Sequence, residues 1–445
     1  MTRSKKAAKK LSPPPVIDPY LPETGNFGYR VSRYELELEY KVAINRLAGS
    51  ATITAVALAA LRSFTLDLSP ALSVSRVSVN GARPARYRCA DGKLSITLPS
   101  TLPAGAAMTV VVRYNGTPRP IESLWGEVGF EELSDGALVA GQPNGAASWF
   151  PCDDHPSSKA SYRIQISTDS PYYALANGEL LARKSRAGHT VWTYEQTEPT
   201  STYLITLQIG MYERQRLAKA PVPIHAVLPA RLRREFEHDF AQQPDMMSVF
   251  IELFGPYPLT TGYTVVITED DLEIPLEAQG ISVFGANHCD GSNGAERLIA
   301  HELAHQWFGN SVTARRWRDI WLHEGFACYA EWLWSERSGG RTAAQWAEHY
   351  HARLRELPQD LLLSDPGPAD MFDDRVYKRG ALTLHALRTS IGDRNFFALL
   401  REWTARYRHS TAFTGDFTGL AAGYTDAPLQ PLWQAWLYSK ALPDL

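Results

Sequence analysis

The sequence has 445 residues and a formal net charge of −3, with 45 basic and 48 acidic side chains. This balance leaves no basic surface for nucleic acid, and the length favours two or three domains over a single core. The four cysteines lie far apart and form no CxxC pair, so they do not match a zinc ribbon or a disulfide scaffold and favour a reducing compartment. No run of about 18 apolar residues occurs. We therefore expect a soluble, cytoplasmic protein that binds neither nucleic acid nor membrane, and the sequence indicates no oligomeric state.

The first residues, MTRSKKAAKKLSPPP, carry the positive charge of a signal peptide, but no apolar segment follows them. Charge and proline without apolar residues are typical of a chain that cannot build a core. We predict that residues 1–25 form a disordered basic leader.

Residues 26–215 alternate apolar and polar side chains in short runs such as YELELEY and SYRIQIS, separated by Gly, Pro and Asn. A period of two residues between turn signals is typical of half-buried antiparallel strands. Helical patterns do not interrupt these runs. The pattern predicts an N-terminal all-β domain, built as a sandwich or a large antiparallel saddle.

Residues 216–445 follow a different pattern, which predicts a mainly helical domain. Two helical segments are expected around Pro244, the second ending at Gly255, and YTVVITE (263–269) is expected to be a buried strand. Two further helices are predicted in AERLIAHELAHQWFGN and in IWLHEGFACYAEWLWSERSGG, each closed by glycine. The fold class is therefore multidomain α+β.

The segment HELAH at 301–305 has the spacing of a metal site. His301 and His305 are four residues apart, so on a helix both imidazoles leave the same face and can reach one ion, with Glu302 beside them. A catalytic zinc site uses three protein ligands and leaves one position for water. Glu324 follows nineteen positions after His305 inside the apolar segment DIWLHEGFACYAEWLW, where a carboxylate is costly to bury unless a cation accompanies it.

Together, HELAHQWFGN and WLHEGFA resemble the gluzincin family of aminopeptidase N-type metallopeptidases. The resemblance implies an N-terminal β-saddle and a thermolysin-like catalytic domain. It also implies that His301, His305 and Glu324 bind one zinc ion and that Glu302 is the general base. Zinc lowers the pKa of bound water toward about 7, and an adjacent carboxylate can take the water proton and pass it to the leaving amine.

An enzyme that cuts only at the N-terminus must hold a free ammonium at a fixed distance from the metal. The resemblance places IPLEAQG (274–280) at the family's GxMEN loop, with Glu277 as the anionic anchor. Ile274 stands in place of the family's glycine and Ala278 in place of its asparagine. Gln142, nine positions before Pro151, is the second residue implied to contact the substrate amine.

The segment VYKRGALTLHALR resembles the helix start that carries the family's tyrosine, which implies that Tyr377 donates a hydrogen bond to the oxyanion. Tyr377 lies near the end of the sequence, so we expect a short form without the large C-terminal helical domain of many members, and a comparatively open site. Asp319, His323 and Glu331 lie near the metal helices and could orient ligands, but cap or surface roles fit equally well.

These residues predict a zinc-dependent aminopeptidase acting on peptides. A zinc endopeptidase or an epoxide hydrolase on the same fold stays open as an alternative, because only the glutamate of the GxMEN loop is retained. A binding scaffold without catalysis is a further alternative, although a scaffold has no chemical need for Glu302 and Tyr377 beside three metal ligands.

Overall fold

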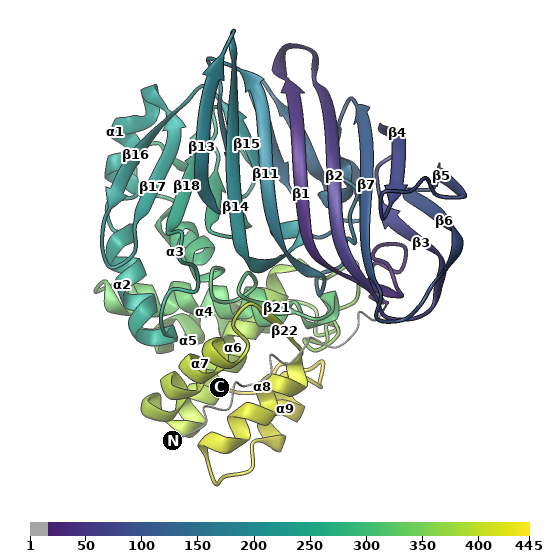
Figure 1. Cartoon of the computed structure of the whole chain (residues 1–445). Helices are drawn as coiled ribbons and strands as arrows, with labels where there is room; N and C mark the ends of the chain where they lie inside the picture. Colours follow the sequence, from purple (N-terminus) through teal and green to yellow (C-terminus); the bar gives the residue numbers. More distant parts are fainter. Residues whose placement is uncertain (1–16) are drawn as a thin grey trace, which may run out of the picture.

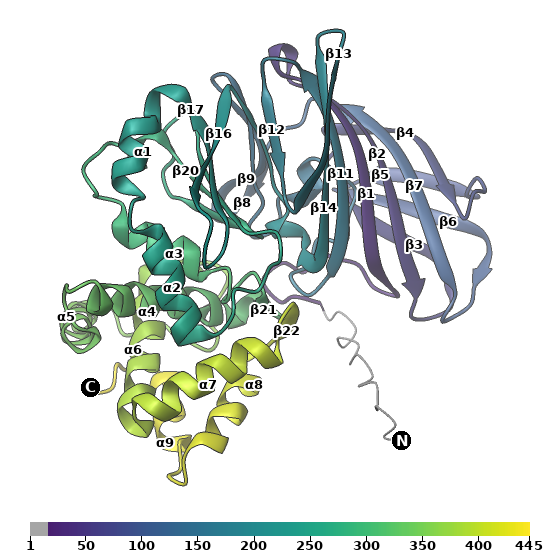
Figure 2. The same cartoon turned by 60° about the vertical axis from the view of Figure 1, so that its left-hand side comes forward.

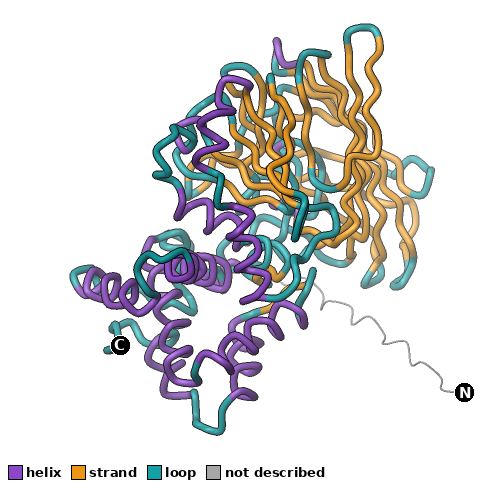
Figure 3. Tube along the Cα trace, turned by 90° about the vertical axis from the view of Figure 1, so that its left-hand side faces the viewer, coloured by secondary structure: helices purple, strands orange, loops and turns teal. Residues whose placement is uncertain are grey.

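The computed structural model describes residues 17–445, whose strands and helices separate into two parts. In Figure 1 the large sheet fills the upper right, whereas most helices gather in the lower half. Figure 3 shows the same division from another side, with strands in orange and helices in purple. The predicted order of a β-rich part followed by a mainly helical part is confirmed.

A seven-stranded sheet forms the main wall of the first part, in the order β13-β14-β11-β1-β2-β7-β4. Neighbouring strands are antiparallel except β1 and β11, so the predicted antiparallel saddle contains one parallel pair. The strands are β1 (Tyr29–Lys41), β2 (Arg46–Ala57), β4 (Leu72–Val79), β7 (Ala107–Gly116), β11 (Lys159–Asp169), β13 (Glu179–Arg186) and β14 (His189–Ser201).

Alternation along β1 explains why this sheet covers a core. Leu36 and Leu38 are buried together with Tyr34 and Tyr40, whereas the glutamates between them are at least partly exposed. Successive side chains of a strand point to opposite faces, so one face of β1 is apolar. Two smaller sheets close the core, one of β8 (Ile121–Ser123), β9 (Gly126–Leu133), β10 (Gly136–Ala140), β12 (Tyr173–Ala176) and β15 (Leu207–Gly210), the other of β3 (Leu61–Asp67), β5 (Arg86–Ala90) and β6 (Lys93–Leu102).

The second part begins with a mixed sheet in the order β16-β17-β18-β20-β19. Its strands are β16 (Tyr212–Ala218), β17 (Ile224–Pro229), β18 (Tyr263–Ile267), β19 (Leu276–Ala278) and β20 (Ile281–Phe284). The predicted boundary at residue 215 falls inside β16. The helices are α1 (Arg233–Asp239), α2 (Gln243–Phe254), α3 (Glu296–Ala304), α4 (Trp321–Arg337), α5 (Ala343–Arg355), α6 (Asp374–Ile391), α7 (Asp393–Arg406), α8 (Thr414–Ala421) and α9 (Gln430–Trp436), and β21 (Val312–Ala314) pairs with β22 (Ser410–Ala412).

Residues 17–25 correct the predicted extent of the disordered leader; residues 1–16 of that leader lie outside the described residues. Asp18 is fully buried, and its carboxylate accepts a hydrogen bond of 2.7 Å from the backbone N–H of Trp317. The buried Tyr20 donates through its hydroxyl to Asp365 at 2.5 Å. Composition indicated a solvated tail, but these polar contacts anchor the segment to the helical part.

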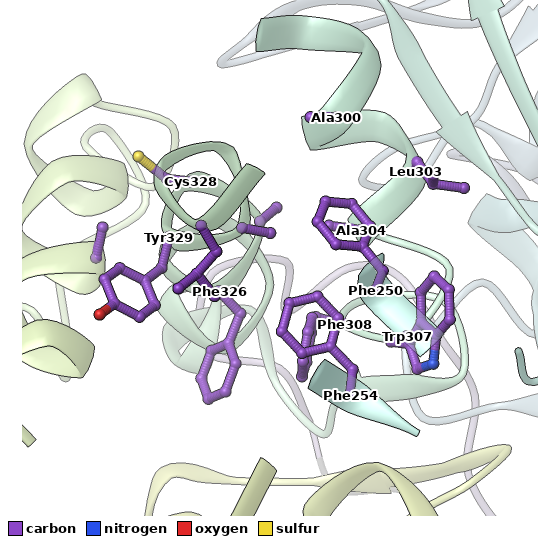
Figure 4. Packing of buried hydrophobic residues seen from close by; sticks show 14 of the residues in the cluster. Phe250, Phe254, Ala300, Leu303, Ala304, Trp307, Phe308, Phe326, Cys328 and Tyr329 are labelled. Atoms are coloured by element: carbon purple, nitrogen blue, oxygen red, sulfur yellow. The ribbon is translucent and has the colours of Figure 1, made fainter. Parts of the chain in front are cut away.

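Helix α3 lies between the mixed sheet and α4 (Figure 2). Figure 4 shows the apolar packing around it, where Phe250 and Phe254 of α2 approach Trp307 and Phe308 beyond the end of α3. The Phe254 and Phe308 rings meet edge to face, with centroids 4.9 Å apart. Trp307 is 1% exposed and belongs to this core. Buried aromatic packing of this kind fixes helix positions closely.

Helices α4 and α6 cross at a pair of glycines. A Cβ atom placed on Gly325 would lie 2.8 Å from the Cα of Gly380, and one placed on Gly380 would lie 2.6 Å from the Cα of Gly325. Either methyl group would force the backbones apart. This close approach holds Tyr377, one turn before Gly380, beside the His301 ring, with centroids 6.0 Å apart.

Replacing Gly380 with alanine is therefore expected to destabilise the protein by about 1–3 kcal/mol, because two backbones must separate to admit one methyl group. Thermal unfolding followed by circular dichroism measures the effect as a lower midpoint. Gly419→Ala in α8 is the matched control, because no heavy atom lies within 4 Å of the added Cβ. An alanine there should leave the midpoint unchanged or raise it; equal midpoints for the two variants would contradict the tight crossing.

Candidate active site

Two neighbouring helices bring the three predicted metal ligands together. His301 lies in the last turn of α3, His305 at its C-terminal cap, and Glu324 in the first turn of α4. Their ligand atoms all lie within 4.8 Å of one another. The Glu324 Oε2 atom is 3.3 Å from His301 Nε2 and 3.4 Å from His305 Nε2. All three residues are buried.

The helix that carries the histidines is shorter than predicted. The α-helical geometry ends at Ala304 instead of continuing to the glycine at position 309. Beyond it, the Nδ1 atom of His305 lies 3.0 Å from the carbonyl oxygen of Phe308, and Gly309 has a φ of 112°, which favours glycine. The chain turns here, and the Phe308 carbonyl faces the His305 side chain.

Glu331, left open between an orienting and a structural role, lies against the other histidine. Its Oε1 atom is 2.7 Å from His301 Nδ1 and also accepts a hydrogen bond of 3.0 Å from Arg297. Acceptors at both Nδ1 atoms favour the tautomer in which each Nε2 atom keeps its lone pair. Those two lone pairs face the Glu324 carboxylate, an arrangement that fits a cation held among the three groups.

The electrostatics of the site also favour a cation. Burial lowers the pKa of His305, but Glu324 and Glu277 outweigh it and raise that pKa to about 10. Burial raises the pKa of Glu324, yet both histidines reverse this and hold it well below its usual range. Two imidazoles and a carboxylate at these distances fit a tetrahedral zinc ion with one position left for water.

Glu302 and Tyr377 lie beside these ligands. Glu302 is 4% exposed, and within residues 17–445 its Oε2 atom has no hydrogen-bond partner. Burial raises the pKa of Glu302, against the opposing effect of the two histidines. Burial, followed by Glu324, raises the pKa of Tyr377 well above its ordinary value, so its phenol keeps its proton at neutral pH and can donate a hydrogen bond.

Glu277 and Gln142 line one cavity of about 610 Å³ together with Tyr377. Glu277 contributes a carboxylate oxygen within 4.8 Å of ligand atoms of Glu302 and His305. Its Oε1 atom and the Nε2 atom of Gln142 are buried and find no partner in the described part of the chain. Burial raises the pKa of Glu277 to about 7. The cavity therefore presents unpaired polar atoms next to the metal ligands.

Sequence reasoning missed the residues that hold the Glu277 strand in place. The Gln306 side chain donates to the Ala278 carbonyl at 3.1 Å and accepts from the Gly280 N–H at 2.8 Å, and Asn310 also donates to Ala278 at 2.9 Å. Gln306 and Asn310 belong to HELAHQWFGN, so the motif itself carried the signal. Because these bonds use backbone atoms, the strand is fixed although Ala278 replaces an asparagine.

The remaining weak candidates serve the frame of the site. Asp319 accepts two hydrogen bonds from Thr414, at 3.0 and 2.6 Å, and so joins the start of α8 to the short turn that precedes α4. The Nε2 atom of His323 accepts from the backbone N–H of Ala314 at 2.7 Å. Burial lowers the pKa of His323 to about 3, so it is neutral. Neither residue contacts a metal ligand through these bonds.

Family models match both parts of the chain. The peptidase M1 N-terminal domain matches residues 31–204, and the peptidase family M1 domain matches residues 285–436. The chain is similar over 96% of its length to a crystal structure of an M1 zinc metallopeptidase from Deinococcus radiodurans, of which it covers 98%, with 31% identity and a TM-score of 0.87. The chain belongs to peptidase family M1, as the resemblance predicted, and the cofactor of this family is a single catalytic zinc ion.

Named relatives are longer than this chain. A leucyl aminopeptidase of Saccharolobus solfataricus is 27% identical over 69% of this chain and 42% of its own length. Aminopeptidase M1-D of Oryza sativa subsp. japonica is 25% identical over 92% of this chain and 50% of its own length. The chain thus spans about half the length of these relatives. Within the described residues, no helix is both long enough and apolar enough to cross a membrane.

Replacing Glu331 with glutamine is expected to weaken zinc binding roughly 10–100-fold, because the acceptor that orients His301 loses its charge. Competition with a chromogenic chelator measures this affinity without any substrate. Glu348→Gln serves as control, because this exposed glutamate lies on α5 away from the ligands. Equal zinc affinity in the two variants would show that Glu331 does not tune His301.

Proposed function

We propose that this protein is a zinc-dependent aminopeptidase that hydrolyses the N-terminal peptide bond of peptides. The observation that carries the proposal is the position of Glu277, which shares a cavity with Tyr377 and has a carboxylate oxygen within 4.8 Å of a His305 ligand atom. Its Oε1 atom is buried and has no partner among the described residues. A buried carboxylate at that distance fits the free ammonium of a substrate whose first peptide bond reaches the metal. The aminopeptidase names of the relatives support the same reading.

Each residue has a role in this proposal. His301, His305 and Glu324 would hold zinc, which would supply a Lewis acid for the scissile carbonyl and for the attacking water. Glu302 takes a proton from that water as its oxygen bonds to the carbonyl carbon, and gives the proton to the leaving amine as the C–N bond breaks. Tyr377 donates a hydrogen bond to the carbonyl oxygen as it gains negative charge.

Gln142 completes the anchor for the ammonium. Rotation of the Gln142 side-chain amide exchanges the positions of its nitrogen and oxygen. An ammonium in the cavity would therefore favour the orientation in which the amide oxygen faces it. Glu277 supplies the charge and Gln142 a neutral acceptor. The substrate of an endopeptidase presents no terminal ammonium for this pair to hold, which favours the aminopeptidase over the endopeptidase.

Replacing Glu302 with glutamine is expected to lower kcat by roughly 10²–10⁴, because an amide cannot take the proton of the attacking water. The amide keeps the shape of the side chain, so zinc content measured by atomic absorption should match that of the unchanged protein. Glu348→Gln is again the control. A variant that retains full zinc and full activity would remove Glu302 as the base.

A panel of aminoacyl arylamides, with and without chelator, tests the proposed activity itself. Free aminoacyl arylamides should be cleaved, the chelator should abolish cleavage, and added zinc should restore it. The N-acetylated forms should be refused, because acetylation removes the ammonium that Glu277 and Gln142 hold. Ready cleavage of acetylated substrates would contradict an aminopeptidase and indicate an endopeptidase.

A further inference from the structure

The cavity beside the metal ligands is acidic beyond what an ammonium anchor requires. Its walls carry Glu127, Glu131 and Glu273 in addition to Glu277. Among the described residues that line it, none is lysine, arginine or histidine. Like charges gathered in one partly desolvated space repel one another, and a cation placed among them relieves the repulsion. Three carboxylates are thus left without a task in the proposed reaction.

Glu127 and Glu131 lie four residues apart on β9. Glu131 is half-buried, and neither side chain forms an ion pair with any residue between 17 and 445. Burial, together with the charge of Glu127, raises the pKa of Glu131. By contrast Glu132, the next residue, points elsewhere and accepts a hydrogen bond of 2.9 Å from Asn45. The two cavity-facing glutamates are therefore available to a ligand.

Aromatic rings line the same cavity. Trp125 and Phe372 meet edge to face, with centroids 5.8 Å apart and planes at 82°. The indole N–H of Trp125 donates to the carbonyl oxygen of Pro368 at 2.8 Å. Pro368 belongs to the helical part of the chain, so this bond fixes the position of the ring against that part. Tryptophan is the strongest cation–π partner among the side chains. Aliphatic residues of the same walls, such as Val128 and Leu276, suit the methylene stem of a long cationic side chain.

We propose that this cavity receives the side chain of a basic N-terminal residue, arginine above all, with Glu131 and Glu127 pairing with the guanidinium against Trp125. Arginine is favoured over lysine because its planar head forms paired hydrogen bonds with carboxylates, stacks on aromatic rings and is weakly hydrated. N-terminal aspartate and glutamate are refused by the same charges. This inference rests on the proposed aminopeptidase activity, in which Glu277 holds the α-ammonium of the same residue.

The test compares kcat/KM for arginyl, citrullyl, leucyl and glutamyl arylamides at one ionic strength. Citrulline keeps the length and planar end of arginine without its charge, so the arginine-to-citrulline ratio isolates the ionic contribution. A charged hydrogen-bonded pair predicts a ratio of roughly 10–100. The glutamyl substrate should be cleaved least.

Glu131→Gln should reduce the arginine-to-citrulline ratio several-fold, because it lowers kcat/KM for the charged arginyl substrate more than for the neutral citrullyl one. Glu132→Gln is the matched control on the same strand and should keep the ratio. Glu127→Gln provides a second cavity variant, and circular dichroism confirms that each variant is folded.

The outcomes separate this inference from the activity on which it rests. Equal cleavage of arginyl and citrullyl substrates, or a ratio unchanged by both Glu131→Gln and Glu127→Gln, would overturn the basic-residue preference while the aminopeptidase stands. Failure to cleave any of the four substrates in the presence of zinc would overturn the aminopeptidase and, with it, the preference.

Discussion

Buried carboxylates crowd two imidazoles where α3, α4 and β19 meet, and such a group is stable only with a cation among its members. Glu324 faces both Nε2 atoms at 3.3 and 3.4 Å, while Glu302 and Glu277 add negative charge nearby. The surrounding structure serves this arrangement. Glu331 and the Phe308 carbonyl turn the imidazoles toward Glu324, and the Gly325–Gly380 crossing brings α6 against α4.

The same environment gives three glutamates different pKa values, which suit the different roles proposed for them. Contact with two histidines holds the pKa of Glu324 well below its usual range, which suits a permanent metal ligand. Burial outweighs the histidines at Glu302 and raises its pKa, which suits a group that accepts a proton and returns it. Glu277, farther along the cavity, has its pKa raised to about 7 by burial and has no protein partner for Oε1 among the described residues. Position, and not residue type, thus separates the proposed ligand, base and anchor.

Much of the metal site could be predicted because its signals are local. His301 and His305 follow from helical spacing, and Glu324 follows from a charge set in an apolar segment. The β-rich part could also be predicted, because the alternation of apolar and polar side chains, as in β1, depends only on neighbouring residues. The end of α3 could not be predicted from the sequence, because Trp307 and Phe308 continue the apolar pattern of the helix although the backbone turns there.

Other features depend on packing between distant segments and left no local signal. Glu331 orients His301 only because α4 lies against α3, so the sequence could not separate this role from a surface ion pair. Glu127 and Glu131 reach the cavity from β9, far from the HELAH segment in the chain. Residues 17–25 were predicted to be a disordered tail because their partners lie far away in the sequence. Asp18 pairs with Trp317 across 299 positions, and Tyr20 pairs with Asp365 across 345 positions.

The central claim is that one zinc ion binds to His301, His305 and Glu324 and leaves Glu277 free for a substrate amine. A crystal structure with anomalous data collected on both sides of the zinc absorption edge tests it most directly. The account predicts a single zinc peak at roughly 2.0–2.1 Å from the Nε2 atoms of both histidines and beside the Glu324 carboxylate. A peak held instead by Glu277, Glu302 and His305, or no zinc at either place in zinc-containing buffer, would contradict it.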